Sequence, residues 1–251
     1  MPNGCISLDR ILAKLDAYLH QKDFSAAERH LNYWLAEAQH NNDRSTEMAM
    51  RNELMGLYRK LGREREALGS AQDARARVEE LGISHQVGAA TTYLNCATVC
   101  KAFGRAEEAI PLFEAAREIY ERELEPADTR LGGLYNNMAL ALVDLGRYLE
   151  ANDLYHRAIW VMKQDEKGSP ELAVTYLNLA SAAEAERGLE DAAEIIESYL
   201  KMAKDCLEAH PTRDGYYAFV CEKCASVFGY YGHFYYAKEL ADRARRIYEG
   251  T

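Results

Sequence analysis

The chain has 251 residues, of which 48% are hydrophobic and 28% are charged, and its formal net charge is −10. These proportions are typical of a folded protein rather than a disordered one. An acidic chain without a basic block is not expected to bind phosphate backbones or anionic lipid, and its apolar runs are too short to cross a bilayer. We therefore expect no nucleic-acid partner and no membrane association.

The first residues and the cysteines indicate where the protein resides. Asp9, Arg10 and Lys14 interrupt the segment in which a signal peptide needs an unbroken apolar core. The six cysteines lack the spacing of a disulfide framework and are typical of free thiols in a reducing compartment. The expected location is cytoplasmic.

A repeat of 42 residues organises most of the chain. Gly62, Gly104 and Gly146 stand 42 residues apart, each preceded by Leu or Phe and followed by Arg, and Gly188 and Gly232 continue the series. Glycine after an apolar run supplies the left-handed residue that ends one helix and begins a tight turn. These glycines therefore predict the turn inside each helix pair.

Alanine recurs five residues after each of these glycines, and in most units again seven residues later. Alanine at these phases lets the paired helices approach closely, so that larger residues interdigitate beside them. The alanines are Ala67, Ala109, Ala151, Ala193 and Ala237, then Ala74, Ala116, Ala158 and Ala244; the larger residues are Leu112, Leu154, Ile196 and Leu240.

In chain order, these markers predict about six antiparallel helix pairs and no strand. The first helices are expected over roughly 8–20, 45–61, 87–103, 129–145, 171–186 and 215–230, and the second over roughly 24–39, 64–81, 106–123, 148–164, 189–208 and 234–248. In the first pair Lys22 replaces the glycine and Trp34 the second alanine, as is common in a terminal unit. The predicted fold is an all-α, right-handed superhelical solenoid that forms one domain over 1–251, with a degenerate pair at 8–39 and clear repeats over 45–248.

The fifth pair departs from the pattern. Gly188 lies one place later after Tyr176 than Gly146 does after Tyr135. This difference predicts one extra residue in the first helix of that pair. Leu200 also stands where the second alanine is expected.

The segment from Tyr135 to Ala158 resembles a tetratricopeptide repeat, and the segments from Tyr93 to Ala116 and from Tyr176 to Leu200 resemble it less closely. The long, 42-residue form is similar to the repeats of kinesin light chains and of many bacterial tetratricopeptide proteins. The resemblance covers residues 45–250 clearly and 8–44 weakly. It implies a helical repeat fold and a concave groove, lined by the first helices, that holds a peptide or a protein surface.

The repeat phase assigns a set of first-helix side chains to this groove, and Glu184 and Ser226 share their phase. Asn95, Asn137 and Asn178 each follow the tyrosine of their unit by two residues, although asparagine inside a helix costs about 0.6 kcal/mol relative to alanine. A carboxamide both donates and accepts, so it is suited to holding a peptide backbone; the alternative is that it bonds a neighbouring helix. The predicted groove residues are Asn52, Arg59, Asn95, Thr98, Lys101, Asn136, Asn137, Asp144, Asn178 and Ser181.

Aromatic residues are concentrated between Tyr216 and Tyr236, at the last helix pair. An uncapped, tyrosine-rich end is suited to docking a partner or forming a homodimer. The alternative is that the polar residues of the last helix cover this end themselves. The predicted partner surface consists of Tyr230, Tyr231, Tyr235 and Tyr236.

The sequence carries no catalytic motif. Cys221 and Cys224 form a C-x-x-C without a second motif in register, and both fall on the buried stripe of their helix, so we expect a packed core rather than a metal site. No nucleophile elbow, phosphate-binding loop or paired-carboxylate arrangement occurs, and no cofactor is implied. We expect a non-catalytic scaffold or adaptor for an unidentified protein or peptide. The alternatives are a peptide-responsive regulator of the bacterial sensor type and, less favoured, an enzyme.

Overall fold

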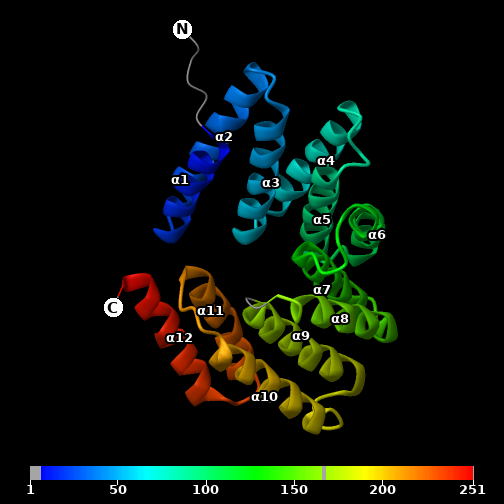
Figure 1. Ribbon diagram of the computed structural model, residues 1–251, viewed down its shortest axis with the longest axis vertical. Helices are drawn as coiled ribbons and strands as arrows, with labels where there is room; N and C mark the ends of the chain where they lie inside the picture. Colours follow the sequence, from blue (N-terminus) through cyan, green and yellow to red (C-terminus); the bar gives the residue numbers. More distant parts are fainter. Residues whose placement is uncertain (1–6, 166–167, 251) are drawn as a thin grey trace. The chain divides into compact units, whose positions relative to one another are not determined.

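The computed structural model describes residues 7–165 and 168–250, which form twelve α-helices and no strand (Figure 1). The predicted all-α repeat fold is confirmed, and the largest difference in a helix boundary is the start of α10. The helices are α1 Leu8–His20, α2 Phe24–His40, α3 Arg44–Lys60, α4 Glu64–Glu80, α5 Val87–Ala102, α6 Ala106–Glu123, α7 Thr129–Asp144, α8 Tyr148–Met162, α9 Ser169–Arg187, α10 Ala193–Ala209, α11 Gly215–Tyr230 and α12 Phe234–Glu249.

Each pair turns at a left-handed residue, as the glycine series predicts. The five glycines of the series have φ between 67° and 86°, and Lys22 takes the same conformation in the first pair, with φ 56°. In the regular turns the residue after the glycine donates its N–H to the carbonyl five positions back, as Arg105 does to Cys100 at 2.9 Å. This bond ends the first helix and aims the chain into the second.

The turn after α9 is built differently. Gly188 has φ 83° and ψ 161°, and its own N–H donates to the carbonyl of Glu184 at 2.7 Å. Residues 189–192 form a further turn before α10 begins at Ala193. The first helix of this pair is longer than predicted: α9 has 19 residues where α5 and α7 have 16, three more rather than the one extra residue expected.

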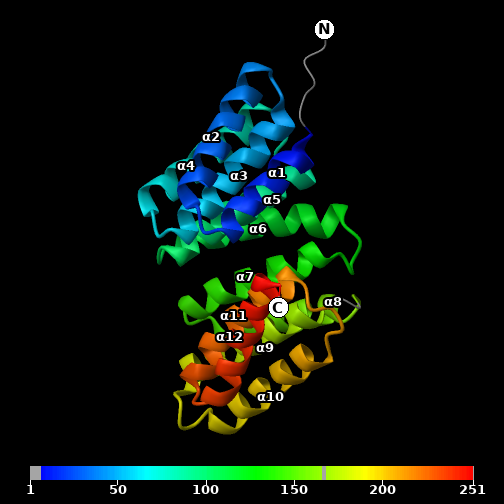
Figure 2. The ribbon, with the colours of Figure 1, turned by 90° about the vertical axis from the view of Figure 1, so that its left-hand side faces the viewer.

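The contacts divide the chain into two compact units, Met1–Ile119 and Tyr120–Thr251. In unit 1, α3 packs against α2, α4 and α5. In unit 2, α7 packs on α8, α9 on α10 and α11 on α12, while α9 also contacts α7, α8 and α11 (Figures 1 and 2). That residues 1–251 form a single domain stays a prediction.

Small residues fill most of the helix contacts as predicted, but Ala237 is only half-buried and one position needs correction. Ala67, Ala109 and Ala151 of the first phase are at most 1% exposed, and the four alanines of the second phase are also buried. The prediction for Ala193 is wrong, because this residue is exposed and Ala192 is buried in its place. The altered turn after α9 moves the close-packing position by one residue.

A buried carboxylate joins three helices of unit 1. Glu47 of α3 is 2% exposed, and its oxygens accept hydrogen bonds from Arg51 and from Arg77 of α4 at 3.0 Å. Gln39 of α2 donates to it at 3.4 Å. Burial opposes the charge, but the bonds from Arg51 and Arg77 outweigh it and hold the pKa of Glu47 below its usual value.

Two glycine-to-alanine changes in unit 1 are expected to have opposite effects on stability. Gly104 has φ 74° and Gly69 lies inside α4, and an added Cβ has nothing within 4 Å at either position. Gly104→Ala should lower the free energy of unfolding by about 1 kcal/mol, because alanine is strained at positive φ. Gly69→Ala should raise it by about 0.5–1 kcal/mol through helix propensity. Urea denaturation measures both free energies of unfolding. If both substitutions changed stability in the same direction, the need for a positive φ at Gly104 would be refuted.

Glu47→Gln is expected to lower the free energy of unfolding by about 2 kcal/mol near pH 7. The substitution replaces the buried carboxylate by a neutral amide, so the hydrogen bonds from the guanidinium groups of Arg51 and Arg77 lose their charged acceptor. A carboxyl whose pKa falls on folding stabilises the protein above its unfolded pKa, and this contribution is lost as the pH falls through the folded value. The difference between the two proteins should therefore shrink below the usual pKa of 4.5. Glu80→Gln, which removes an exposed partner of Arg77, is the control and should have little effect.

Candidate functional site

The predicted groove residues lie on the first helices of the pairs. We call the surface that the first helices form within a unit its first-helix face; it comprises α3 and α5 in unit 1, and α7, α9 and α11 in unit 2. Successive first helices contact each other within each unit. Side chains at their shared phase therefore line up from one helix to the next.

In unit 1, two predicted asparagines form a hydrogen bond between α3 and α5. The carboxamide nitrogen Nδ2 of Asn95 donates to Oδ1 of Asn52 at 3.0 Å. Nδ2 of Asn52 donates in turn to Oγ1 of Thr92, which is fully buried, at 3.2 Å. Asn95 thus makes the hydrogen bond to a neighbouring helix that was the sequence-based alternative to peptide binding.

Unit 2 repeats this pair between α7 and α9. Nδ2 of Asn178 donates to Oδ1 of Asn136 at 3.0 Å. Asn137 instead donates to the carbonyl of Gly133, one turn earlier in its own helix, at 2.9 Å. Its Oδ1 has no partner within the part of the chain that the structure describes. All three asparagines are half-buried, so their side chains border the surface.

The other predicted groove residues are polar or charged side chains of α3, α5, α7 and α9. The hydroxyls of Thr98 and Ser181 donate to carbonyls of their own helices, at 2.8 and 3.2 Å. Arg59 and Asp144 are exposed, and Lys101 is half-buried. These groups suit recognition by hydrogen bond and charge more than bond-making chemistry.

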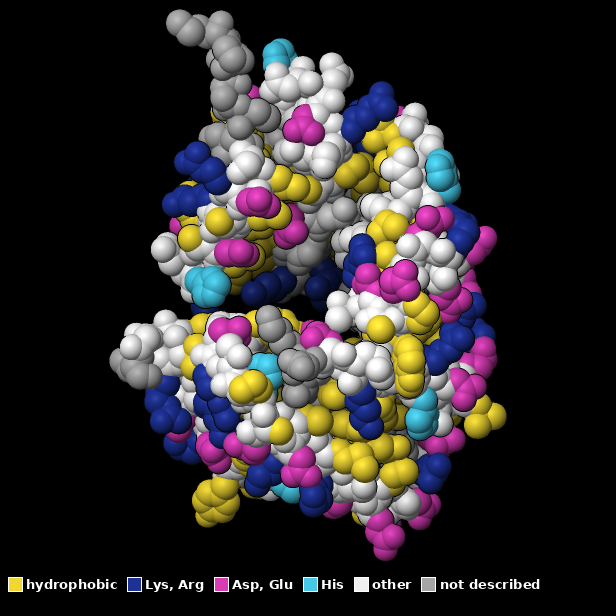
Figure 3. All heavy atoms as spheres, viewed as in Figure 1, with side chains coloured by type: hydrophobic (Ala, Val, Ile, Leu, Met, Phe, Trp, Pro, Cys, Tyr) yellow, Lys and Arg dark blue, Asp and Glu magenta, His cyan; other side chains and the backbone are white. Residues whose placement is uncertain are grey.

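Carboxylates with raised pKa values occur on the same face. In unit 1, burial and then the nearby Asp16 raise the pKa of Glu53. In unit 2, burial raises the pKa of Glu171, whose carboxylate accepts a hydrogen bond from the hydroxyl of Tyr216. Lys223 partly opposes this shift through its charge. Acidic and basic side chains are interspersed on the face of the molecule seen in Figure 3.

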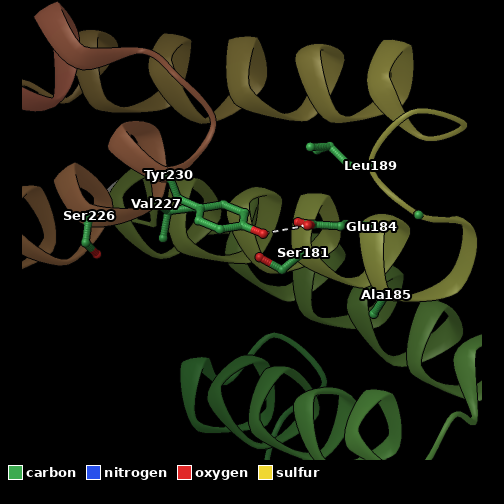
Figure 4. A pocket seen from close by; sticks show the side chains of 8 residues that line it. Ser181, Glu184, Ala185, Leu189, Ser226, Val227 and Tyr230 are labelled. Atoms are coloured by element: carbon green, nitrogen blue, oxygen red, sulfur yellow. Dashed lines mark hydrogen bonds between the residues drawn. The ribbon is translucent and has the colours of Figure 1, made fainter.

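A hollow of about 620 Å³ lies at the end of α9, next to Ser181 (Figure 4). The Glu184 carboxylate stands in it and accepts hydrogen bonds from the hydroxyls of Tyr230 at 2.6 Å and Tyr231 at 2.7 Å. The side chains of Leu189 and Val227 form an apolar part of its wall. The repeat phase places Glu184 on the first-helix face, but the hollow depends on the altered turn at Gly188 and was not predicted.

The structure separates the four predicted C-terminal tyrosines. Tyr236 is 8% exposed, packs edge-on against Phe228 and donates to Glu208 at 2.7 Å, so it is part of the core of unit 2. Tyr231 is half-buried against Glu184. Tyr230 and Tyr235 are exposed. A partner surface at this end is therefore reduced mainly to Tyr230 and Tyr235, and self-association stays a prediction.

Cys221 and Cys224, which were predicted to be buried, are part of the core, and so is Cys96. Cys96, Cys221 and Cys224 are at most 1% exposed, and burial raises the pKa of Cys96 and of Cys224 to about 12. Among the described residues, no group of three or more His, Cys, Asp or Glu side chains is arranged to hold a metal ion. None of the helices in that part of the chain is long and apolar enough to cross a membrane.

Comparisons with known proteins identify the repeat. A tetratricopeptide repeat family model matches residues 45–122, and a second such model matches residues 132–160. Among curated proteins, none matches the sequence.

Several solved structures share the fold. Kinesin light chain tetratricopeptide-like repeats from Podosopora anserina are 20% identical, with a TM-score of 0.54, over 80% of this chain and 94% of that one. BtubC (BKLC) from P. vanneervenii is 20% identical, with a TM-score of 0.59, over 92% and 91%. NprR in complex with its cognate peptide NprX is 18% identical, with a TM-score of 0.61, over 94% and 65%. At these identities the likeness shows the fold alone.

The asparagines are expected to differ in their effect on stability. Asn137→Ala should leave the free energy of unfolding unchanged or slightly higher, because the lost bond is local and alanine favours the helix by about 0.6 kcal/mol. Asn95→Ala and Asn178→Ala should be less stable than Asn137→Ala by about 1 kcal/mol, since each loses a bond to another helix. Urea denaturation measures the difference. Three equal values would show that the asparagine pairs do not contribute.

Proposed function

We propose that this chain, a tetratricopeptide repeat protein, binds an extended peptide segment of another protein on its first-helix face and has no catalytic role of its own. The single observation that carries this proposal is that, within each unit, half-buried carboxamides stand on successive first helices, α3 and α5 in unit 1 and α7 and α9 in unit 2. Polar groups at successive first helices have the spacing of a repeat, so they suit a ligand that runs across the helices. The regulator alternative stays a prediction.

The carboxamides keep hydrogen-bonding capacity for such a ligand. Asn95 and Asn178 each use one N–H for the neighbouring helix, and a carboxamide has a second N–H and an acceptor oxygen. Asn137 uses one N–H for its own helix. A peptide backbone offers donors and acceptors in alternation, so it matches such groups whatever its side chains are. Binding of this kind orders a flexible segment, which limits affinity.

Selection of random peptides displayed on phage tests the proposal directly. The intact chain should enrich a set of peptides, and synthetic copies of these should bind in fluorescence anisotropy. Asn137→Ala should weaken binding roughly tenfold, which corresponds to about 1.4 kcal/mol. Asn152→Ala, the same change at an exposed position of the second helix α8, should leave affinity unchanged.

Two outcomes would contradict this function. Failure of the folded wild-type chain to enrich any peptide would show that the face is not a peptide-binding surface. Equal affinity of Asn137→Ala and Asn152→Ala would place binding away from the first-helix face.

A further inference from the structure

The hollow at the end of α9 contains a carboxylate without a counter-charge. Glu184 accepts two phenolic hydrogen bonds, one on each oxygen. Within the part of the chain that the structure describes, no Lys, Arg or His side chain forms an ion pair with it. Its neighbour Glu186, by contrast, pairs with Arg187 at 3.1 Å. A carboxylate oxygen can accept more than one hydrogen bond, so Glu184 keeps acceptor capacity toward the hollow.

The walls around this carboxylate are apolar and hydroxylic. Tyr230 lies across the hollow with its hydroxyl at Glu184, and Leu189 and Ser181 lie on either side of that contact (Figure 4). Leu189 is 53% exposed and Tyr230 is 68% exposed, so both present apolar surface to water beside the carboxylate. Ser226 and Val227 of α11 complete the rim.

The local backbone explains why the hollow is found in this unit. The extended ψ of Gly188 and the turn over 189–192 delay the start of α10, and Leu189 belongs to that turn. The hydroxyl of Tyr148 donates to the carbonyl of Ala185 at 3.0 Å, which fastens the end of α9 to the start of α8. The carboxylate is therefore presented from a fixed helix end rather than from a loose loop.

From these observations we infer that the hollow is a pocket for one basic side chain, arginine or lysine, of the bound peptide segment. The cation pairs with Glu184, a charge-assisted bond that is about twice as strong as a neutral one. The aliphatic stem lies along Leu189 and Val227, and the Tyr230 ring lies beside the charge. The inference rests on the proposed function, since it specifies what the first-helix face recognises.

The test uses the phage-displayed random peptides and their synthetic copies. Enriched peptides should share an arginine or lysine. Replacing an essential arginine by citrulline keeps its shape but removes its charge, and should weaken binding roughly tenfold. Glu184→Gln in the protein should weaken binding of the arginine peptide to a similar degree. It should not weaken binding of the citrulline peptide any further. Affinity should also fall as salt is added.

Two further variants keep the test independent of folding. Glu186→Gln removes a carboxylate of the same helix that lies outside the hollow, and it should bind as the wild type does. Ser226→Trp fills the hollow and leaves Glu184 in place, so it should weaken binding even if Glu184→Gln fails to fold. Circular dichroism checks that each variant is helical.

The outcomes separate this inference from the proposed function. Peptides that bind through Asn137 but lack a basic residue, or that bind Glu184→Gln and the wild type equally, would overturn the pocket and leave the peptide-binding face intact. Absence of any enriched peptide would overturn both. If Glu186→Gln lost as much binding affinity as Glu184→Gln, the effect would come from the net charge of the protein rather than from the hollow. That result would also overturn the pocket.

Discussion

The left-handed residue inside each helix pair is the constraint on which the rest of the structure depends. It ends the first helix, fixes where the second helix begins and so decides which alanine of that helix reaches the neighbouring one. Where Gly104 and Gly146 form the regular turn, Ala109 and Ala151 are buried. Where Gly188 adopts an extended ψ, the buried position moves to Ala192 and a hollow forms beside the turn. The candidate recognition site and the packing correction have the same cause.

The asparagine pairs show how a repeat protein combines structure with binding. The bonds from Asn95 to Asn52 and from Asn178 to Asn136 join successive first helices at equivalent places in the two units. They hold the carboxamides in fixed orientations, and fixed groups lose less entropy when a ligand binds. Leu94 of α5 takes the repeat position that Asn52 takes in α3 and Asn136 in α7, so the asparagine pair does not recur in every first helix. A structural role and a binding role are therefore compatible on one face.

Much of the fold could be predicted from the sequence because its signals are local. The glycines at a 42-residue spacing and the alanines after them determine helix ends and close contacts, and both depend on a few neighbouring residues. The burial of the Glu47 carboxylate was not predicted, since it depends on Arg51 of α3 and Arg77 of α4 meeting at this carboxylate in the folded chain. The hollow at Glu184 was missed because the one extra residue expected in α9 predicts a departure but not its shape. The tyrosines near the C-terminus looked alike in sequence, yet Tyr236 is buried and Tyr235 is 95% exposed.

Hydrogen–deuterium exchange with and without a selected peptide tests the central claim, that the first-helix face holds the ligand. Protection should increase in the first helices α3, α5, α7, α9 and α11, where ligand contact suppresses local opening, while α4, α8 and α10 should exchange at their former rates. Protection confined to the second helices, or spread evenly over both sets, would contradict the account.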